Sequence, residues 1–478
     1  MTSILPRSAS ELTISPAQRA DMDLAAKYAC EGPRYTSYPT APQFRQDFPA
    51  DQYLAWQARD GDHKRAPLSL YLHLPFCRDI CYYCACNKIV TRKKGVTRLY
   101  LDRLEREIEQ QSQLVGTQRP ITQMHWGGGT PTYLDNAEIT ELMHMLASHF
   151  RLLDKDYREY SIEIDPRTVD ASTIALLKGV GFNRISLGIQ DFDPLVQLAV
   201  NRVQPYEQVA PLVDIIRSHH FRSLSFDLIY GLPQQDRYTM KATLQKVNSL
   251  RPDRIACYNY AHLPQRFSSQ RSIDRLTLPA PEEKLLLQQM ISHTLQDAGY
   301  LHIGMDHYVL PEDELAVALR EGRLQRNFQG YSLHMADDLL GLGVSAISQI
   351  GDFYLQNERD LEAYYNLIDS GQLPFNRGCK LTAEDKLRRH VIMTLIGELR
   401  LDIGDCNRQF GIDFADRFSA ELAALEPMVG DGLVEINDKE MIVTHRGRPF
   451  LRNICMPFDA YLNAHSGDQP PPRFSATI

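Results

Sequence analysis

The sequence predicts an α/β fold in which six strand–helix units form an open, partial barrel. From about residue 69 onward, short β-branched or apolar runs alternate with longer amphipathic runs, the pattern of a parallel sheet with crossover helices. Polar and glycine-rich residues cluster directly after the short runs, and in barrel-like folds the carboxyl ends of the strands carry the chemistry. Six units fall short of a closed barrel of eight, so we expect a wide lateral mouth that admits a large substrate.

The six expected strands are short apolar segments: Leu68–Leu74, Gln123–Trp126, Tyr160–Ile164, Arg184–Gly188, Leu224–Ile229 and Arg254–Tyr258. The expected helices are the amphipathic runs that follow them: 97–114, 135–150, 170–179, 206–218, 237–249 and 281–297. The motifs after the strands are a cysteine-rich loop, GGGTP, DPR, QDF, YGLP and NYAHLP. In parallel strands these motifs meet at one edge of the sheet, where we expect the functional site.

The chain is expected to divide into an N-terminal arm over 1–65, the barrel with a substrate-side extension over 66–373, and a C-terminal domain over 374–478. Prolines between Gly32 and Phe44 prevent regular structure in the arm, so we expect it to lie over another part of the molecule. Pro374–Leu381 has the composition of a linker.

The C-terminal domain is expected to be mostly helical and winged-helix-like. Helical patterns cover 382–400 and 414–428, and Gly432–Thr444 has two alternating runs around a polar turn, which is typical of a hairpin. Winged helices often bind DNA, but Thr382–Glu426 mixes acidic and basic residues and has no basic stripe. A structural or lid role is the expectation here. The proline-rich tail Gln469–Pro472 is expected to be extended.

The overall composition is that of a globular protein that binds neither nucleic acid nor an anionic membrane. The 478 residues are 43% hydrophobic, and 52 Lys and Arg against 60 Asp and Glu give a net charge of −8. The start of the sequence lacks a signal-peptide pattern, and no apolar run is long enough to span a bilayer. Four of the nine cysteines fall within ten residues. We therefore expect a cytoplasmic protein with a metal site.

The strongest single signal is a C-x3-C-x2-C run, Cys77, Cys81 and Cys84, on the loop after the first strand. Structural zinc prefers two separated pairs of ligands. A [4Fe–4S] cluster needs one ligand per iron, so three thiolates leave the fourth iron open to a substrate or cofactor. A fourth cysteine, Cys86, would close the cluster and make an electron carrier if it were a ligand, or it would remain a free thiol; the local sequence does not decide between them.

Further candidates lie after the later strands. The glycines of Gly127–Pro131 let the backbone approach a ligand, although a tight turn explains them equally well. Glu163, Gln190 and Asp227 lie at or near strand ends and suit ribose hydroxyls, while a structural polar role is the alternative for each. Arg202 suits a carboxylate through bidentate pairing, and a surface arginine is the alternative.

The cysteine spacing resembles that of the radical S-adenosylmethionine enzymes. The resemblance implies that the amino and carboxylate groups of S-adenosylmethionine bind the open iron. The reduced cluster then cleaves it to methionine and a 5′-deoxyadenosyl radical. It also implies that Cys77, Cys81 and Cys84 are the ligands and Cys86 is not, and that the glycine motif contacts the methionine amino group.

Longer motifs are similar to those of one branch, the oxygen-independent coproporphyrinogen III oxidases. They are Tyr71–Cys77, Cys84–Lys88, His125–Leu134, Gly181–Phe192, Asp227–Pro233, Asn327–Tyr331 and Arg452–Met456, and the similarity runs from about Gly32 to the C-terminus. The resemblance implies that the cluster-bound S-adenosylmethionine is held by Tyr71, Gly128, Glu163, Gln190 and Arg202. It implies a second S-adenosylmethionine, with contacts to one or the other from Tyr83, Gly129, Thr130, Asp227, Ala261 and Ile347. The chain departs from the usual pattern at Tyr83, Ala85 and Pro457.

This resemblance implies anaerobic oxidative decarboxylation of two propionates of coproporphyrinogen III to vinyl groups, giving protoporphyrinogen IX in haem biosynthesis. A monomer with a low-potential electron donor and an electron acceptor is expected. The alternatives are a haem chaperone of the same superfamily, a radical enzyme that modifies RNA, and a plain electron carrier. Such chaperones typically lack the arm and the fourth cysteine, which are both present here. Arg34, Tyr35 and Tyr38 of the arm are expected to close over the barrel mouth, and Thr91–Lys94 could attract the substrate's carboxylates or be a solvated face.

Overall fold

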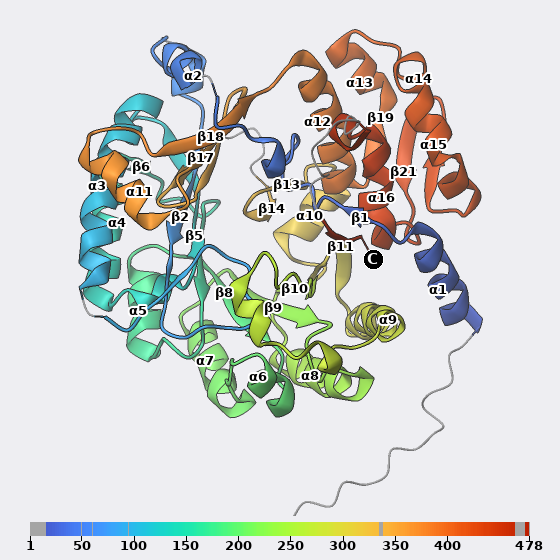
Figure 1. Ribbon diagram of the computed structural model, residues 1–478, viewed down its shortest axis with the longest axis horizontal. Coiled ribbons are helices and arrows are strands. Elements are labelled where there is room, and N and C mark those ends of the chain that lie inside the picture. The colour runs from blue at the N-terminus through green and yellow to red at the C-terminus, as the bar shows by residue number, and fades with distance from the viewer. Residues whose placement is uncertain are drawn as a thin grey trace, which may run out of the picture.

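One mixed sheet of thirteen strands organises the molecule (Figure 1). The computed structural model describes residues 16–48, 50–59, 61–93, 95–333, 338–463 and 474–477. The six predicted strands lie side by side and parallel in the order β10-β9-β8-β7-β5-β2. They are β2 (Leu68–Leu74), β5 (Pro120–Gly128), β7 (Glu159–Ile164), β8 (Arg184–Gln190), β9 (Ser223–Tyr230) and β10 (Arg254–Asn259). The predicted partial barrel is therefore confirmed.

All six predicted helices are present and cover the outer face of the strands (Figure 1). They are α3 (Val96–Val115), α4 (Asn136–His149), α5 (Ala171–Gly179), α7 (Tyr206–Ser218), α8 (Arg237–Leu250) and α9 (Pro281–Asp297). Aspartates begin several of them: Asp135 accepts from the Glu138 backbone N–H in a capping box, and Asp236 caps α8 in the same way. Between helix and strand lies the main core, in which the four leucines of β2 are at most 1% exposed.

Additional strands extend the sheet at both ends. β11 (Leu301–Gly304) and β12 (His307–Val309) add antiparallel strands beside β10. On the other side, β15 (Asp338–Leu342) runs parallel to β2 and is followed by the antiparallel β16 (Ile347–Ile350), β17 (Phe353–Asn357) and β18 (Phe375–Lys380). The sequence analysis did not assign these strands.

The prediction that Pro374–Leu381 is a linker is wrong. Phe375–Lys380 forms β18, which pairs antiparallel with β17 in the register Phe353↔Lys380. Its proline, glycine and charged residues suggested a linker, but a strand at a sheet edge tolerates them, and here the outer side of β18 is paired only at Gly378, with Arg45 of the arm. Gly378 is required there, since a Cβ atom would collide with the carbonyl oxygen of Tyr354.

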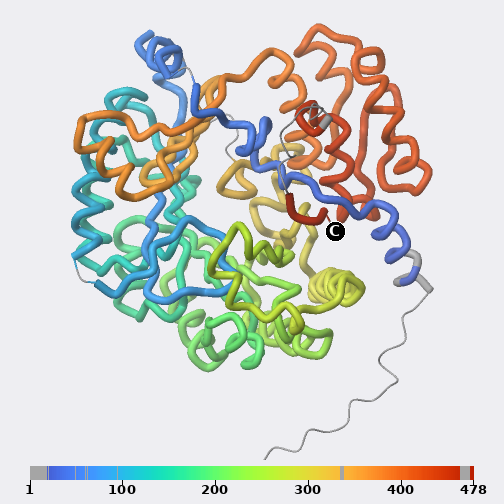
Figure 2. The backbone as a smooth tube through the Cα atoms, in the orientation of Figure 1, coloured from blue at the N-terminus to red at the C-terminus, as the bar shows by residue number. Residues whose placement is uncertain are grey.

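The N-terminal arm crosses from the barrel to the C-terminal domain, between the two (Figure 2). It contains α1 (Pro16–Tyr28) and α2 (Ala50–Gln57), with one 3-10 turn in the irregular segment between them. Tyr35 and Tyr38 are fully buried in the C-terminal core, and the Tyr35 hydroxyl donates to Asp459 Oδ2 at 3.1 Å. The prediction that Tyr35 and Tyr38 close over the barrel mouth is therefore wrong, because both rings pack in the C-terminal core, and only Arg34 of the three lines the barrel cavity.

The C-terminal domain combines helices with a three-stranded sheet. The predicted elements are present as α12 (Ala383–Glu398), α15 (Ser419–Gly430) and the hairpin β20 (Val434–Ile436) and β21 (Glu440–Val443). The structure adds β19 (Arg400–Asp402), α13 (Ile403–Phe410) and α14 (Phe414–Arg417). The single helix expected over 414–428 is therefore divided into α14 and α15. The tail Gln469–Pro472 lies outside the described residues.

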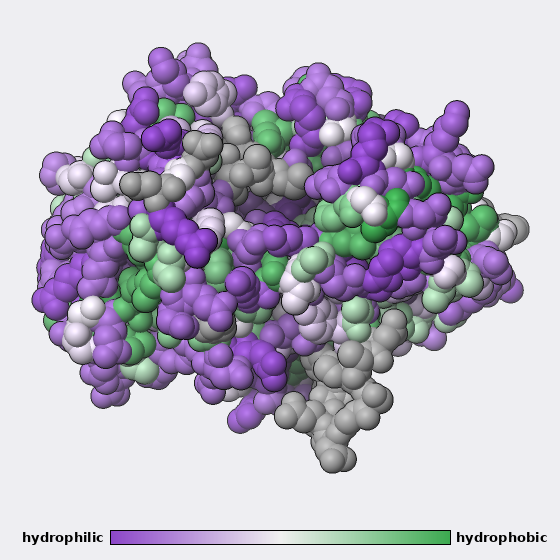
Figure 3. All heavy atoms as spheres, turned by 90° about the horizontal axis from the view of Figure 1, so that it is seen from above, coloured by the Kyte–Doolittle hydropathy of each residue, from purple (hydrophilic) through white to green (hydrophobic). Residues whose placement is uncertain are grey.

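The surface seen in Figure 3 is mostly hydrophilic, with hydrophobic residues in separate patches. Among the helices of the described residues, none combines the length and the apolar composition needed to cross a bilayer.

Candidate active site at the carboxyl ends of the barrel strands

The cysteine loop follows β2 and is tied to several other loops. Short strands on either side of it, β3 (Phe76–Cys77) and β4 (Ile89–Val90), pair with each other. Lys88 Nζ donates to the Cys84 carbonyl at 3.0 Å, and Ser269 Oγ donates to the same carbonyl at 2.9 Å. Asn201 Nδ2 donates to the Ile80 carbonyl at 2.7 Å. Ser269 and Asn201 belong to distant segments, so the fold fixes the loop's shape.

Cys77, Cys81 and Cys84 are free thiols that line one side of a cavity of about 270 Å³. No three His, Cys, Asp or Glu side chains of the described chain are close enough to share a single metal ion. A [4Fe–4S] cluster has no such requirement, because each thiolate binds a different iron. Three sulfurs spaced around a cavity at a strand end therefore fit a cluster.

Two guanidinium groups face the cluster cysteines. Arg202 Nη1 lies 3.5 Å from Cys81 Sγ, and Arg167 Nη2 lies 3.9 Å from the same sulfur. Asp165 accepts from both arginines, at 3.1 Å from Arg202 Nη1 and 2.6 Å from Arg167 Nη2, and these cations hold its pKa below the usual range against the effect of burial. Two cations thus lie beside one of the predicted cluster ligands.

Cys86 contacts the predicted ligand Cys84. A side-chain hydrogen bond between them lowers the pKa of Cys84 to about 6 and raises the pKa of Cys86 well above its usual value. The sulfur of Cys86 therefore lies within hydrogen-bonding reach of a predicted cluster ligand.

The glycine motif packs against the cysteine loop. Gly129 N–H donates to the Leu74 carbonyl at 2.8 Å, and a Cβ atom at Gly129 would lie 2.5 Å from the Pro75 carbonyl oxygen. Gly128 has φ +114°, and a Cβ there would lie 2.9 Å from the His73 ring. Close packing of two backbones thus requires these glycines, and the same surface lines the cavity.

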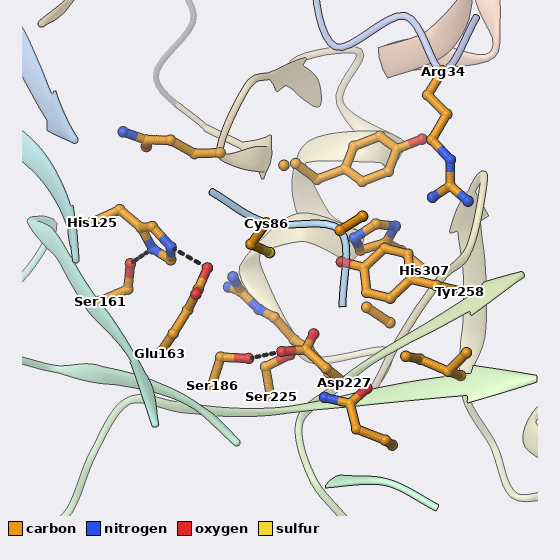
Figure 4. Close-up of a pocket in the computed structure, with 18 of the residues that line it drawn as sticks. Arg34, Cys86, His125, Ser161, Glu163, Ser186, Ser225, Asp227, Tyr258 and His307 are labelled. Atoms are coloured by element: carbon orange, nitrogen blue, oxygen red, sulfur yellow. Dashed lines mark hydrogen bonds and ion pairs between the residues drawn. The ribbon is translucent and has the colours of Figure 1, made fainter. Parts of the chain in front are cut away.

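Glu163 is oriented by a chain of aromatic and polar groups. His125 Nε2 lies 3.0 Å from Glu163 Oε1, and His125 Nδ1 lies 2.6 Å from Ser161 Oγ (Figure 4). The Tyr71 ring stacks on His125 with centroids 6.0 Å apart. Gly127 leaves room for the carboxylate, since a Cβ there would lie 2.8 Å from Glu163 Oε1. Tyr71 therefore supports the site from behind His125.

Strand β8 ends in an irregular turn that shapes the next part of the wall. A bulge lies between Gly188 and Gln190, and Gln190 has φ +67°, which is strained for a residue with a side chain. Arg202 Nη2 donates to the Gly188 carbonyl at 2.6 Å. Ser186 Oγ of β8 donates to Oδ2 of Asp227, on the adjacent β9, at 2.9 Å, and burial followed by the charge of Glu163 raises the pKa of Asp227 to about 7.

A second cavity of about 600 Å³ continues from the first into the barrel. The two cavities share the lining residues Tyr83, Cys84, Cys86, Glu163, Gln190 and Asp227. The side of the larger cavity that is away from the cysteines is lined by residues of β10, β12 and the arm, including Tyr258, His307 and Arg34 (Figure 4). A cofactor pocket beside the cysteines thus opens into a larger chamber.

The structure brings nearly all predicted site residues to these cavities. The lining includes the three cysteines and Tyr83, Gly128, Gly129, Thr130, Glu163, Gln190, Arg202, Asp227 and Ala261. Two predicted residues lie outside the lining: Tyr71, behind His125, and Ile347, at the start of β16. The backbone of Ile347 packs on Gly341, which pairs with Tyr71 across the sheet.

The sequence analysis did not single out Asp165, Arg167, His125 or His307 as site residues. Asp165 and Arg167 belong to the DPR motif after β7, so their place at a strand end was an available signal. His307 comes from a strand that had no motif.

Comparison with known proteins identifies the family of this chain. A model of the Radical SAM superfamily matches residues 71–247, and one of the HemN C-terminal domain matches 381–450. The oxygen-independent coproporphyrinogen III oxidase of Pseudomonas aeruginosa is 49% identical over 445 residues, which cover 93% of this chain and 96% of that protein. The chain belongs to the oxygen-independent coproporphyrinogen III oxidases.

Other members of the oxygen-independent coproporphyrinogen III oxidases agree. The protein of that name from Escherichia coli is 48% identical over 448 residues, covering 93% of this chain and 96% of that protein. The solved structure of coproporphyrinogen III oxidase from Escherichia coli, described as a radical SAM enzyme, superposes with a TM-score of 0.86 at 47% identity, covering 90% of this chain and 97% of that one. The chain is a radical SAM oxidoreductase, whose cofactors are a [4Fe–4S] cluster and S-adenosylmethionine.

Proposed function

We propose that this chain decarboxylates two propionate side chains of coproporphyrinogen III to vinyl groups without oxygen, giving protoporphyrinogen IX in haem biosynthesis. The observation that carries the proposal is near-full-length similarity, at 48–49% identity, to proteins named for this activity. The larger cavity supports it, because about 600 Å³ is within the usual size of a site for a small organic molecule. The haem chaperone gains no support from the described site.

In this proposal Cys77, Cys81 and Cys84 hold the cluster, and Cys86 remains a thiol. S-adenosylmethionine lies in the smaller cavity, where its contacts are Tyr71, Gly128, Glu163, Gln190 and Arg202. Tyr83, Gly129, Thr130, Asp227, Ala261 and Ile347 contact this molecule or a second one. The shared lining of the two cavities supports this division, because a cofactor in the first would face a substrate in the second.

When bound, the cluster and S-adenosylmethionine supply the carbon radical that removes hydrogen from the propionate carbon next to the ring, after which CO2 and one electron are lost. The chain's own residues position and shield the reactants. Glu163 is held by His125 as a hydrogen-bond acceptor for ribose hydroxyls, and the arm residue Arg34 lies over the chamber and shields it from water. No side-chain acid or base is needed, because the C–H bond is not acidic.

Several partner assignments belong to the same proposal. We infer a low-potential electron donor, which the reductive cleavage requires, and an acceptor for the electron left on the substrate. A net charge of −8 supports a protein that binds neither nucleic acid nor an anionic membrane. A monomer in the cytoplasm completes the assignment.

Anaerobic incubation with dithionite, S-adenosylmethionine and coproporphyrinogen III tests the reaction. We expect a product whose mass is lower by two CO2 and four hydrogen atoms, because each of the two side chains loses one CO2 and two hydrogen atoms. 5′-Deoxyadenosine should form at the same time. Cleavage of S-adenosylmethionine with an unchanged substrate mass would reject this substrate. Tight stoichiometric haem binding without decarboxylation would favour the chaperone instead.

A further inference from the structure

The side of the larger cavity away from Glu163 is lined by groups that suit an anion, and Asp227 lies between the two sides, on β9 beside β10 (Figure 4). Arg34 from the arm, Tyr258 from β10 and His307 from β12 meet there (Figure 4). The Arg34 guanidinium lies 5.9 Å from the centre of the Tyr258 ring, and the Tyr258 and His307 rings meet edge to face with centroids 6.0 Å apart. We call Arg34, Tyr258 and His307 the basic wall.

His307 has unused hydrogen-bonding capacity. Its Nδ1 atom is buried and has no partner in the described part of the chain. Burial, followed by the charges of Arg326, His302, Arg34 and Arg254, lowers the pKa of His307 well below its usual value. The ring is therefore neutral at physiological pH and has one N–H to donate. A buried polar atom without a partner is costly, so a bound ligand that pairs with it is stabilised.

Arg34 is only loosely paired. The guanidinium of Arg34 carries five N–H donors. Its polar contacts are long: Nη2 lies 3.3 Å from the Asn259 carbonyl oxygen, and Nη1 lies 3.5 Å from Asp306 Oδ2. The side chain is 33% exposed, so it remains accessible from the cavity. By contrast, Arg184, which also lines the cavity, pairs with both Glu159 and Glu314.

A further guanidinium adds positive charge behind this wall. Arg326 lies 4.9 Å from the centre of the Tyr331 ring, and that ring meets His307 edge to face at 5.0 Å. The Nε and Nη1 atoms of Arg326 are buried without partners among the described residues. A buried cation of this kind favours an anion nearby.

We propose that Arg34, Tyr258 and His307 bind a propionate carboxylate of the substrate, one that is not being decarboxylated in that turnover. The assignment rests on the proposed function, which supplies a substrate with four carboxylates. The reacting propionate must lie where the two cavities meet, near Cys86 and Asp227, so a carboxylate on the opposite wall belongs to another side chain. The carboxylate of Glu163 repels carboxylates from its own side, which orients the macrocycle.

Binding of coproporphyrin III, the oxidised and unreactive form of the substrate, measured by fluorescence, tests the proposal apart from turnover. Its tetramethyl ester is the uncharged comparison. In Arg34→Met, affinity for the tetra-acid should fall about tenfold or more, since hydrogen bonds to charged groups are strong, while affinity for the ester stays unchanged. The affinity of Arg34→Lys for the tetra-acid should lie between those of the wild type and Arg34→Met, because lysine keeps the charge but lacks the planar guanidinium group.

Arg45→Met is the matched control, because Arg45 lies on the same arm with a side chain 79% exposed. It should bind both probes as the wild type does. His307→Phe keeps the ring and loses the N–H, and should lower the ratio of tetra-acid to ester affinity about threefold. If Arg34→Met does not fold, the ratio of tetra-acid to ester affinity in His307→Phe tests the proposal instead.

Equal affinity of wild type and Arg34→Met for the tetra-acid, or equal weakening of both probes, would overturn the proposal. The binding ratio does not depend on turnover. A failure of the proposed function would therefore appear separately, as an unchanged substrate mass in the wild-type reaction.

Discussion

The two sides of the larger cavity are built in different ways. The acidic side, Glu163 and Asp227, lies on the parallel strands β7 and β9, which flank β8, and it borders the cysteine loop. The basic wall combines Arg34 of the arm with residues of β10 and β12, segments more than 200 positions apart along the chain. The acidic side suits a cationic sulfonium cofactor, and the basic wall suits an anionic substrate. Opposite charges across one chamber separate the two binding tasks.

This difference predicts that the tasks can be disturbed independently. The largest effect is expected for Cys81→Ser, because a hydroxyl does not replace a thiolate ligand. Iron and sulfide content should fall to background and turnover should be abolished, while coproporphyrin III binding at the basic wall persists. Iron analysis and fluorescence binding measure the two outcomes. Cys30→Ser, at an exposed cysteine, is the control and should keep its iron. A Cys81→Ser protein with full iron content would remove Cys81 from the ligand set.

Glu163→Gln should weaken S-adenosylmethionine binding by about tenfold or more, since a charged acceptor is lost from the site. Affinity for coproporphyrin III should not decrease. Equilibrium binding of each ligand to the reconstituted protein measures the separation. Glu141→Gln, at a surface carboxylate paired with Arg98, is the matched control and should change neither affinity. Equal loss for both ligands would mean that the two sides do not act separately.

Asp227 should give S-adenosylmethionine binding a pH dependence near neutrality. Burial and Glu163 raise the pKa of Asp227 to about 7, so the side chain becomes negative as the pH rises through that value. The folded pKa of Asp227 exceeds the unfolded value, so the stability of the free protein falls as the pH rises from about 4 to about 7, and a bound cation favours the ionised form. The affinity for S-adenosylmethionine should therefore rise several-fold between pH ~6 and ~8. The rise is up to about tenfold for each unit by which the bound cation lowers the pKa of Asp227.

Asp227→Asn should flatten that pH profile. The dissociation constant of S-adenosylmethionine, measured across the same pH range in both proteins, provides the comparison. An identical slope in the variant would assign the dependence to another group.

The smallest effect is expected for Tyr258→Phe. The Tyr258 hydroxyl points into the cavity (Figure 4), and its removal keeps the ring that packs on His307. Affinity for coproporphyrin III should fall about threefold, consistent with the loss of one neutral hydrogen bond, with no change for the tetramethyl ester. Titration of both probes checks it, and tighter binding of the tetra-acid by the variant would contradict a donor role for Tyr258.

The parts of the molecule that the sequence predicts well are those encoded by local patterns. The six parallel strands and their helices follow from alternating apolar runs, and the cysteine loop and Glu163 follow from their places after those strands. Parallel strands bring their carboxyl ends together, so a list of strand ends is already a rough map of the site.

The parts that it does not predict depend on pairing between distant segments. β18 carries a linker-like composition and is a strand only because β17 offers it an edge. His307 has no motif around it and reaches the cavity because β12 pairs with β10, in the register Ala256↔His307. Arg34 reaches the same wall because the buried Tyr35 and Tyr38 anchor the arm. Such placements are set by tertiary packing, which no local pattern reports.

The account's central claim is that three protein thiolates hold a [4Fe–4S] cluster whose fourth iron binds S-adenosylmethionine. Mössbauer spectra of the reconstituted protein, recorded with and without S-adenosylmethionine, test it most directly. The account predicts that one iron in four differs from the others and changes its parameters when S-adenosylmethionine is added. Four iron sites that do not respond to S-adenosylmethionine, as expected if Cys86 were the fourth ligand, would contradict it.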